Sequence, residues 1–173
     1  MKVSEGAIRA VYVAMEQAAE RVVITDRQGT ILYVNPAFER VTGYAGTEAI
    51  GRTPRILKSG QHDQRFYQML WDRLLNGRSF RARFVNKRKN GELYYEEQTI
   101  SSLKDERGNI THFISTAVDI TGQIAAEKAR ELAEESFQHL QEIALGNTER
   151  VIVLKHEVNA LLQRLGQPPK YNL

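Results

Sequence analysis

The stretch ITDRQGTILYVNPAF, residues 24–38, decides the fold of this chain. It continues a run of β-branched residues that predicts a strand. A turn follows and ends at Gly29, since glycine adopts the positive φ that a tight hairpin needs. The apolar run 31–34 predicts the second strand, and Asn35-Pro36 ends it, because proline has no ladder donor and is favoured in the first turn of a helix. We therefore expect a hairpin and then a short helix closed by Gly43.

A second hairpin is predicted by NKRKNGELYY, residues 86–95, which turns at Asn90-Gly91. Strands are expected at 80–87, 93–103 and 111–118. Between the two hairpins a longer helix begins at Asp63 and carries apolar residues at helical spacing. This order predicts an α+β fold, with one five-stranded antiparallel sheet and short helices on one face.

An amphipathic helix is predicted over residues 1–20, ahead of a core domain that we place at 21–121. Its apolar positions, Ile8, Val11 and Met15, form one stripe at three- and four-residue spacing. The stripe suits packing on its own domain and contact with a second copy equally well.

The C-terminal part is predicted to divide at Gly146. The first segment, 122–146, is rich in strong helix formers and reads as a signalling helix. Glycine interrupts its apolar stripe, and Asn147 or Thr148 can cap a second amphipathic helix within 147–173. Both stripes have the spacing of coiled coils, so we expect a homodimer formed through the N- and C-terminal helices.

Composition excludes several classes of protein. The chain has 173 residues, no cysteine and a formal net charge of +3. The absence of cysteine excludes disulfides, thiolate metal sites and thiol nucleophiles. The small and interleaved charge argues against nucleic acid as a partner, and no apolar run approaches the ~20 residues that span a bilayer. We expect a cytoplasmic protein without a membrane segment.

Seven short motifs occur in a fixed order in residues 21–121: Asn35-Pro36-Ala37-Phe38, Thr42-Gly43-Tyr44, Ile50-Gly51, Leu57-Lys58-Ser59-Gly60, Trp71, Asn86-Lys87-Arg88-Lys89-Asn90-Gly91 and Asp119-Ile120-Thr121. In this order they resemble a PAS sensory domain. The resemblance implies the PAS fold and a role in bacterial signal transduction, including two-component systems. It also implies an output kinase, cyclase or regulator in the same or another chain.

The resemblance to blue-light LOV members of that family is incomplete. They carry a cysteine after the Gly-Arg pair, where this chain has Gly51-Arg52 followed by Thr53-Pro54, so cysteinyl-flavin photochemistry is excluded. Asn86 stands where flavin-binding relatives place an amide, whose donor and acceptor suit the imide edge of the ring. Glu96 replaces a second amide, and Ala117 replaces a glutamine.

A second subgroup, the FAD-containing redox sensors, is similar at Trp71 and at the start of the second hairpin, and Phe80 stands where those proteins have a tryptophan. The resemblance implies FAD or FMN and sensing of redox state or light. A cofactor-free PAS module for dimerisation or protein interaction is the alternative, in which Trp71 and Phe80 are core and Asn86 bonds to backbone. The residues expected to line a ligand site are Asn86, Trp71, Phe80, Gln98, Glu96, Ile56, Leu57 and Tyr67.

Two histidines suggest alternative functions, namely haem binding at His62 and phosphotransfer at His156. Haem needs an axial histidine, and His62 is the local candidate, although it precedes the helix in a loop. His156-Glu157 is similar to the phosphoacceptor dipeptide of histidine kinases, but the proline that normally follows is absent. Glu96 and Glu97 point to opposite faces of a strand and cannot share a site. We find no catalytic constellation and expect a sensor, not an enzyme.

Overall fold

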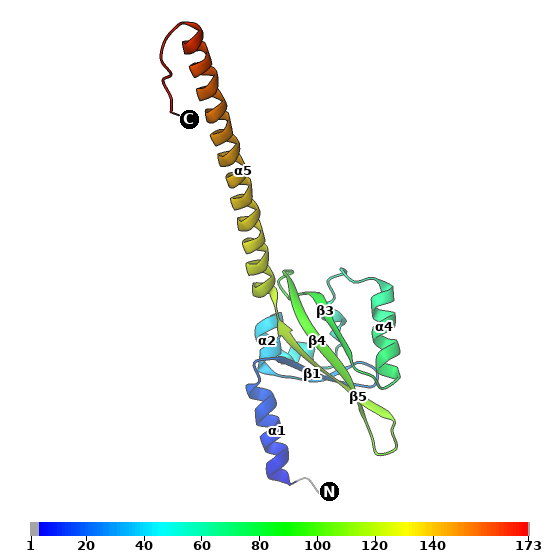
Figure 1. The fold of residues 1–173 in the computed structure, drawn as a ribbon. Coiled ribbons are helices and arrows are strands. Elements are labelled where there is room, and N and C mark those ends of the chain that lie inside the picture. The colour runs from blue at the N-terminus through cyan, green and yellow to red at the C-terminus, as the bar shows by residue number, and fades with distance from the viewer. Residues whose placement is uncertain (1–3, 173) are drawn as a thin grey trace. The chain divides into compact units, whose positions relative to one another are not determined.

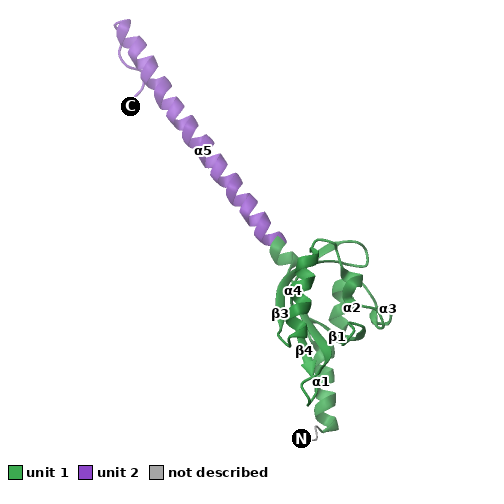
Figure 2. Ribbon diagram, turned by 90° about the vertical axis from the view of Figure 1, so that its right-hand side faces the viewer, with its two compact units in different colours: residues 1–124 green, residues 125–173 purple. Residues whose placement is uncertain are grey.

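The computed structural model describes residues 4–172. Residues 1–3 and 173, which belong to the predicted N-terminal helix and the predicted tail, lie outside the described residues. The chain divides into two compact units, residues 1–124 and 125–173 (Figure 2). Within the described part of the chain, no helix has both the length and the apolar character needed to cross a membrane. The elements are α1 (Glu5–Gln17), β1 (Arg21–Asp26), β2 (Ile31–Val34), α2 (Pro36–Thr42), α3 (Gly46–Ala49), the 3₁₀-helix η1 (Pro54–Leu57), α4 (Gln64–Leu75), β3 (Phe80–Lys87), β4 (Leu93–Lys104), β5 (Ile110–Asp119) and α5 (Thr121–Arg164).

A five-stranded sheet with the order β2-β1-β5-β4-β3 forms the centre of the first unit, and all its pairings are antiparallel. Helix α2 packs against β1, while α4 packs against β3 and β4 (Figure 1). The register places Arg21 of β1 opposite Ala117 of β5, and Ala117 opposite Gln98 of β4. Because opposite residues share a face, these three side chains lie in one row across the sheet. The predicted α+β fold, with one five-stranded antiparallel sheet, is confirmed.

Asn35 joins α1, β1 and α2. Its Oδ1 accepts the N–H of Val22 at 2.9 Å and that of Phe38 at 3.2 Å, which caps α2. Its Nδ2 donates to the carbonyls of Glu20 and Met15. Pro36 follows at the first helical position, as expected. One buried amide therefore fixes how the chain enters both the sheet and the first short helix.

Two apolar clusters fill the space between the sheet and its helices. The first packs Phe38 and Leu57 on Val23 of β1. The second packs Leu74 of α4 on aromatic side chains of β3 and β5, among them Phe84. They lie on the same face of the sheet, and the interval between them is the cavity described below.

The predicted break at Gly146 is wrong, because α5 runs without interruption from Thr121 to Arg164. A helical glycine costs only about 1 kcal/mol relative to alanine, and the flanking residues are strong helix formers. Thr148 does not act as a cap, since its Oγ donates to the Ala144 carbonyl one turn back. The residues expected to open a new helix are therefore accommodated inside one helix.

Candidate functional site

A cavity of about 690 Å³ lies on the helix-covered face of the sheet. The size is typical of sites for small molecules and cofactors. Helix α4 and η1 form its outer wall, with Leu57, Tyr67 and Trp71 among the lining residues. Strands β1, β3, β4 and β5 form its floor. The floor residues that matter below are Arg21, Asn86, Gln98 and Ser115.

Most of the residues expected from the sequence come together at this cavity: Asn86, Trp71, Gln98, Leu57 and Tyr67 line it. Phe80, Glu96 and Ile56 do not. Phe80 is buried in edge contact with Phe66, 5.5 Å between ring centroids, and Ile56 packs against the first apolar cluster. Glu96 is fully buried in the polar network under the floor. A ligand role for any of these side chains is a prediction from the sequence.

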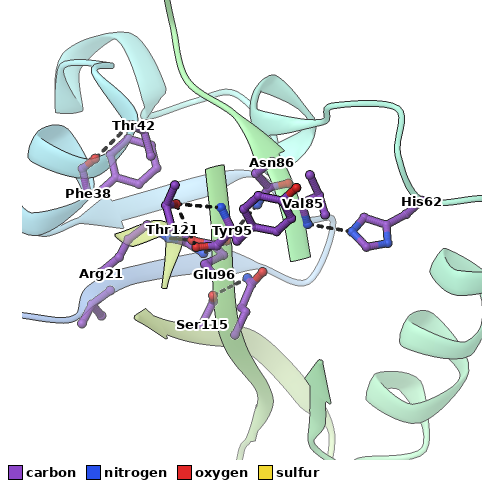
Figure 3. A network of polar contacts seen from close by, with 12 residues as sticks. Arg21, Phe38, Thr42, His62, Val85, Asn86, Tyr95, Glu96, Ser115 and Thr121 are labelled. Carbon is purple, nitrogen blue, oxygen red and sulfur yellow. Dashed lines mark hydrogen bonds and ion pairs between the residues drawn. The ribbon is translucent and has the colours of Figure 1, made fainter. Parts of the chain in front are cut away.

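Arg21, which lines the floor, forms a buried ion pair with Glu96, which does not line it (Figure 3). Arg21 donates through two nitrogens to Glu96, at 2.8 and 3.1 Å, and Asn86 Nδ2 donates to Glu96 Oε1 at 2.8 Å. The Arg21 side chain reaches β4 from β1 by crossing β5 at Ala117, whose methyl group leaves the room. The cofactor-free alternative predicted that Asn86 bonds to the backbone. In the structure its side chain instead donates to the Glu96 carboxylate.

Gln98 extends this network toward the cavity. With its oxygen turned to Ser115 and Arg21, the amide accepts from Ser115 Oγ at 2.6 Å and from Arg21 at 3.3 Å, and it donates to Glu96 at 3.3 Å. Hydrogen bonding is what assigns the oxygen and nitrogen of such an amide. With the opposite orientation it keeps only the bond to Ser115. The amide therefore couples the cavity floor to the ion pair.

The charged residues that line the cavity are all cations: Arg21, Arg55 and Lys58. Arg21 is neutralised by Glu96. Lys58 lies over the Tyr67 ring, 4.7 Å from its centroid, at the wall formed by α4. The part of the wall formed by η1 and Lys58 therefore carries positive charge, while the floor offers amide donors and acceptors.

A second set of contacts connects the floor to the start of α5. The hydroxyl of Tyr94 is buried and has no hydrogen-bond partner among residues 4–172, and burial raises the pKa of this phenol. Arg88 lies over the Tyr94 ring and pairs with Asp119 at 2.8 Å. Asp119 accepts the N–H of Thr121. Thr121 Oγ in turn accepts the N–H of Tyr95 (Figure 3). Burial acts to raise the pKa of Asp119, but the bonds from Thr121 and Arg88 together lower it.

The histidines have other surroundings. No histidine of residues 4–172 lines the cavity. His62 accepts the N–H of Val85 through Nε2 at 2.8 Å and stacks on Phe66. His156 lies exposed on α5. These positions do not favour haem ligation by His62.

The comparisons identify the family. Residues 10–120 match the PAS fold family. The chain belongs to the PAS family. The nitrogen fixation regulatory protein of Klebsiella oxytoca is 30% identical over 146 residues, which are 84% of this chain and 29% of that protein. The blue-light-activated histidine kinase of Brucella anthropi is 29% identical over 66% of this chain and 26% of the kinase. The chain thus spans less than a third of the length of these relatives.

Solved structures with a similar fold include light-oxygen-voltage domains. An RNA-binding light-oxygen-voltage receptor has a TM-score of 0.65 and 25% identity, over 80% of this chain and 42% of that one. A light-oxygen-voltage domain studied with a flavin analogue has a TM-score of 0.60 and 24% identity, over 73% of this chain and 96% of that one. The predicted membership of the PAS family is confirmed. The relatives include regulators and light-activated kinases, which supports a sensory domain.

Sequence reasoning missed Arg21 and Ser115. An arginine that opens a strand is normally exposed, so Arg21 carried no signal by itself. The available signal was its combination with a small residue, Ala117, and a carboxylate, Glu96, on the strands that follow it across the sheet.

Proposed function

We propose that this PAS domain is a sensor that holds a flavin in the cavity and passes changes at the sheet floor into α5. The observation that carries the proposal is the pairing of a cavity of about 690 Å³ with amide groups on its floor and cations at its wall. A cofactor-sized aromatic ring with one polar edge and an anionic tail requires these three features.

The residues present fit that group. Trp71, Tyr67 and Phe113 supply aromatic surface for a planar ring. Asn86 and Gln98 supply donors and acceptors for its imide edge, and Arg55 and Lys58 supply charge for a phosphate. A bound flavin would supply light absorption and electron transfer. The chain's own part is to bind the ring, exclude water and sense its hydrogen bonding. FAD and FMN both satisfy these requirements.

The relay we propose begins at Asn86, which touches both the cavity and Glu96. A ligand that takes the Asn86 amide competes with Glu96 for its N–H groups. Glu96 neighbours Tyr95, whose N–H bonds to Thr121 at the start of α5. A shift of the β4 backbone therefore changes how α5 leaves the sheet, and differential affinity of one ligand is sufficient to bias two such packings.

Absorption of the freshly purified protein, and of the protein loaded with FMN or FAD, tests this function. We expect flavin bands and an Asn86→Ala variant with weaker binding or a shifted spectrum. Gln68→Ala is the matched control, because Gln68 is an exposed amide on the outer side of α4. A colourless protein that binds neither flavin would refute the flavin assignment.

An exposed apolar stripe on α5 favours the second function, homodimerisation. With the break at Gly146 absent, the two predicted stripes lie in one heptad register on the same helix, and Asn147 occupies the position between Ala144 and Val151. Their most exposed members are Phe137, Leu140, Val151, Leu154, Leu161 and Leu165. We infer that two copies of α5 pair along them, whether or not a cofactor is bound.

Light scattering on the full chain tests this pairing. Leu154→Glu should convert the dimer to a monomer, because it places a charge in the seam. Val153→Glu adds the same charge to a residue that is as exposed but lies beside the stripe, and it should leave the dimer intact. Equal effects of the two substitutions on the dimer would contradict pairing along the apolar stripe of α5.

A further inference from the structure

The loop between η1 and α4 covers an exposed edge of the sheet. Strand β3 is an edge strand, so its outward backbone groups have no neighbouring strand. At Val85, side chains of the loop take that place. His62 Nε2 accepts the Val85 N–H at 2.8 Å, and Ser59 Oγ donates to the Val85 carbonyl. The backbone of Lys58 also forms an isolated antiparallel β-bridge with that of Asn86. Both backbone groups of Val85 are thus satisfied by residues 58–62.

The imidazole of His62 is held by rings as well as by this hydrogen bond. It stacks on Phe66, with 4.1 Å between ring centroids, and meets Phe84 edge-on at 5.6 Å. Since Nε2 accepts a hydrogen bond, the ring is neutral and carries its proton on Nδ1. A protonated ring has donors at both nitrogens and would oppose its Nε2–H to the Val85 N–H. Protonation therefore removes the contact that fastens the loop.

The loop connects two parts of the cavity wall. Leu57 and Lys58 line the cavity at its beginning, and Gln64 and Tyr67 line it shortly after its end. On the strand it covers, Val85 is followed by Asn86, whose side chain lines the floor. Movement of residues 59–62 away from β3 would open this side of the cavity.

We propose that residues 58–62 form the entrance to the cavity and that neutral His62 is its latch, which releases when the imidazole is protonated. The use of the entrance by a ligand rests on the proposed function, whereas the latch itself does not.

The groups around His62 set the direction of the pH dependence. Burial against Phe66 and Phe84 lowers the pKa of His62, and the Asp63 carboxylate acts in the opposite direction. From α4 the Tyr67 ring also faces the imidazole, and Lys58 lies over that ring. With the pKa lowered from its ordinary value, the closed latch is fully stabilised above about pH 6.5 and loses stability as the pH falls.

Amide hydrogen exchange measured by NMR, without any ligand, tests the latch. In the wild-type chain, the protection factor of the Val85 amide should fall by up to about tenfold between about pH 7.5 and about pH 5.5. Protection factors correct for the pH dependence of intrinsic exchange. Amides of the interior strand β5 should keep theirs, which separates local opening from global unfolding.

Substitutions of His62 separate the effect of its hydrogen-bond acceptor from the effect of its ring stacking. His62→Gln retains an acceptor that does not titrate in this range, so Val85 should stay protected at both pH values. His62→Phe retains the stacking but not the acceptor, so Val85 should exchange faster at both. His112→Gln, on β5, is the control and should leave Val85 as in the wild type. Equal protection of Val85 at both pH values in the wild type, or an unchanged pH dependence in His62→Gln, would overturn the proposal. Failure to bind flavin would count against the proposed function alone.

Discussion

Removing one partner of the buried ion pair should be among the most damaging single changes in the first unit. Arg21→Met preserves most of the volume of the arginine but leaves the Glu96 carboxylate without its partner. The two side chains are 3% and 1% exposed, so water cannot replace the lost contact. The Asn86 bond to Glu96 remains and cannot neutralise the charge.

The magnitude follows from burial. Breaking a buried pair by removing one partner costs about 3–5 kcal/mol, because an uncompensated charge is left inside. A domain has about 5–15 kcal/mol of total stability, so this single change consumes a large part of it. For a denaturation slope of about 2 kcal/mol/M, the urea midpoint should fall by about 1.5–2.5 M.

The strand that carries Glu96 also supplies the control. Arg81 and Glu97 pair across β3 and β4 at 3.0 Å, with side chains 73% and 45% exposed. Arg81→Met removes the same kind of contact in water and should cost no more than about 1 kcal/mol. Urea unfolding followed by fluorescence of Trp71, the single tryptophan, measures both variants.

A double-mutant cycle completes the test. Arg21→Met with Glu96→Leu removes both charges and should be less damaging than the sum of the single changes, with a coupling free energy of at least about 2 kcal/mol. If Arg21→Met cost no more than Arg81→Met, the pair would not be buried in solution and the account of the cavity floor would be refuted.

Two further predictions concern α5 and its start. Gly146→Ala should raise the helical signal in circular dichroism and stabilise α5 by about 1 kcal/mol, since an added Cβ at Gly146 meets nothing within 4 Å; a loss of helicity would restore the predicted break. Gly43→Ala is its contrast and should destabilise the first unit, because Gly43 has a φ of 75°. Asp119→Asn should cost about 1–2 kcal/mol at neutral pH through weaker bonds to Arg88 and Thr121. Because the folded pKa of Asp119 is lowered, that difference should be present above about pH 4 and vanish as the pH falls further, as measured by urea unfolding at several pH values; a difference that persisted in acid would contradict an ionised Asp119.

The fold could be predicted because its signals are local. Glycine and proline mark the turns, alternation marks the strands, and Asn35 and Asp63 cap the helices where the sequence placed them. The prediction of a helix break at Gly146 was wrong, and the reason is also local. A glycine followed by two capping residues predicts the end of a helix, but the strong helix formers on both sides continue it.

The site could be predicted only in part, because it depends on pairing across the sheet. Asn86 and Trp71 were placed by motifs. Arg21 and Glu96 are 75 residues apart and meet through a register that no local pattern reveals. In the sequence, Ala117 is notable only because LOV relatives have a glutamine at this position. In the structure it lies between Arg21 and Glu96, and its small side chain lets the arginine cross β5.

In the proposed function, an occupied cavity signals through the sheet floor to the start of α5. The most direct measurement is an amide NMR titration of the full chain with FMN. We expect shifts at Asn86, Gln98 and Ser115 that extend through Tyr95 to Thr121, while Gly108 in the distant β4–β5 turn stays unchanged. Saturable binding whose shifts stop at the cavity, or the absence of any shift at its floor, would contradict it.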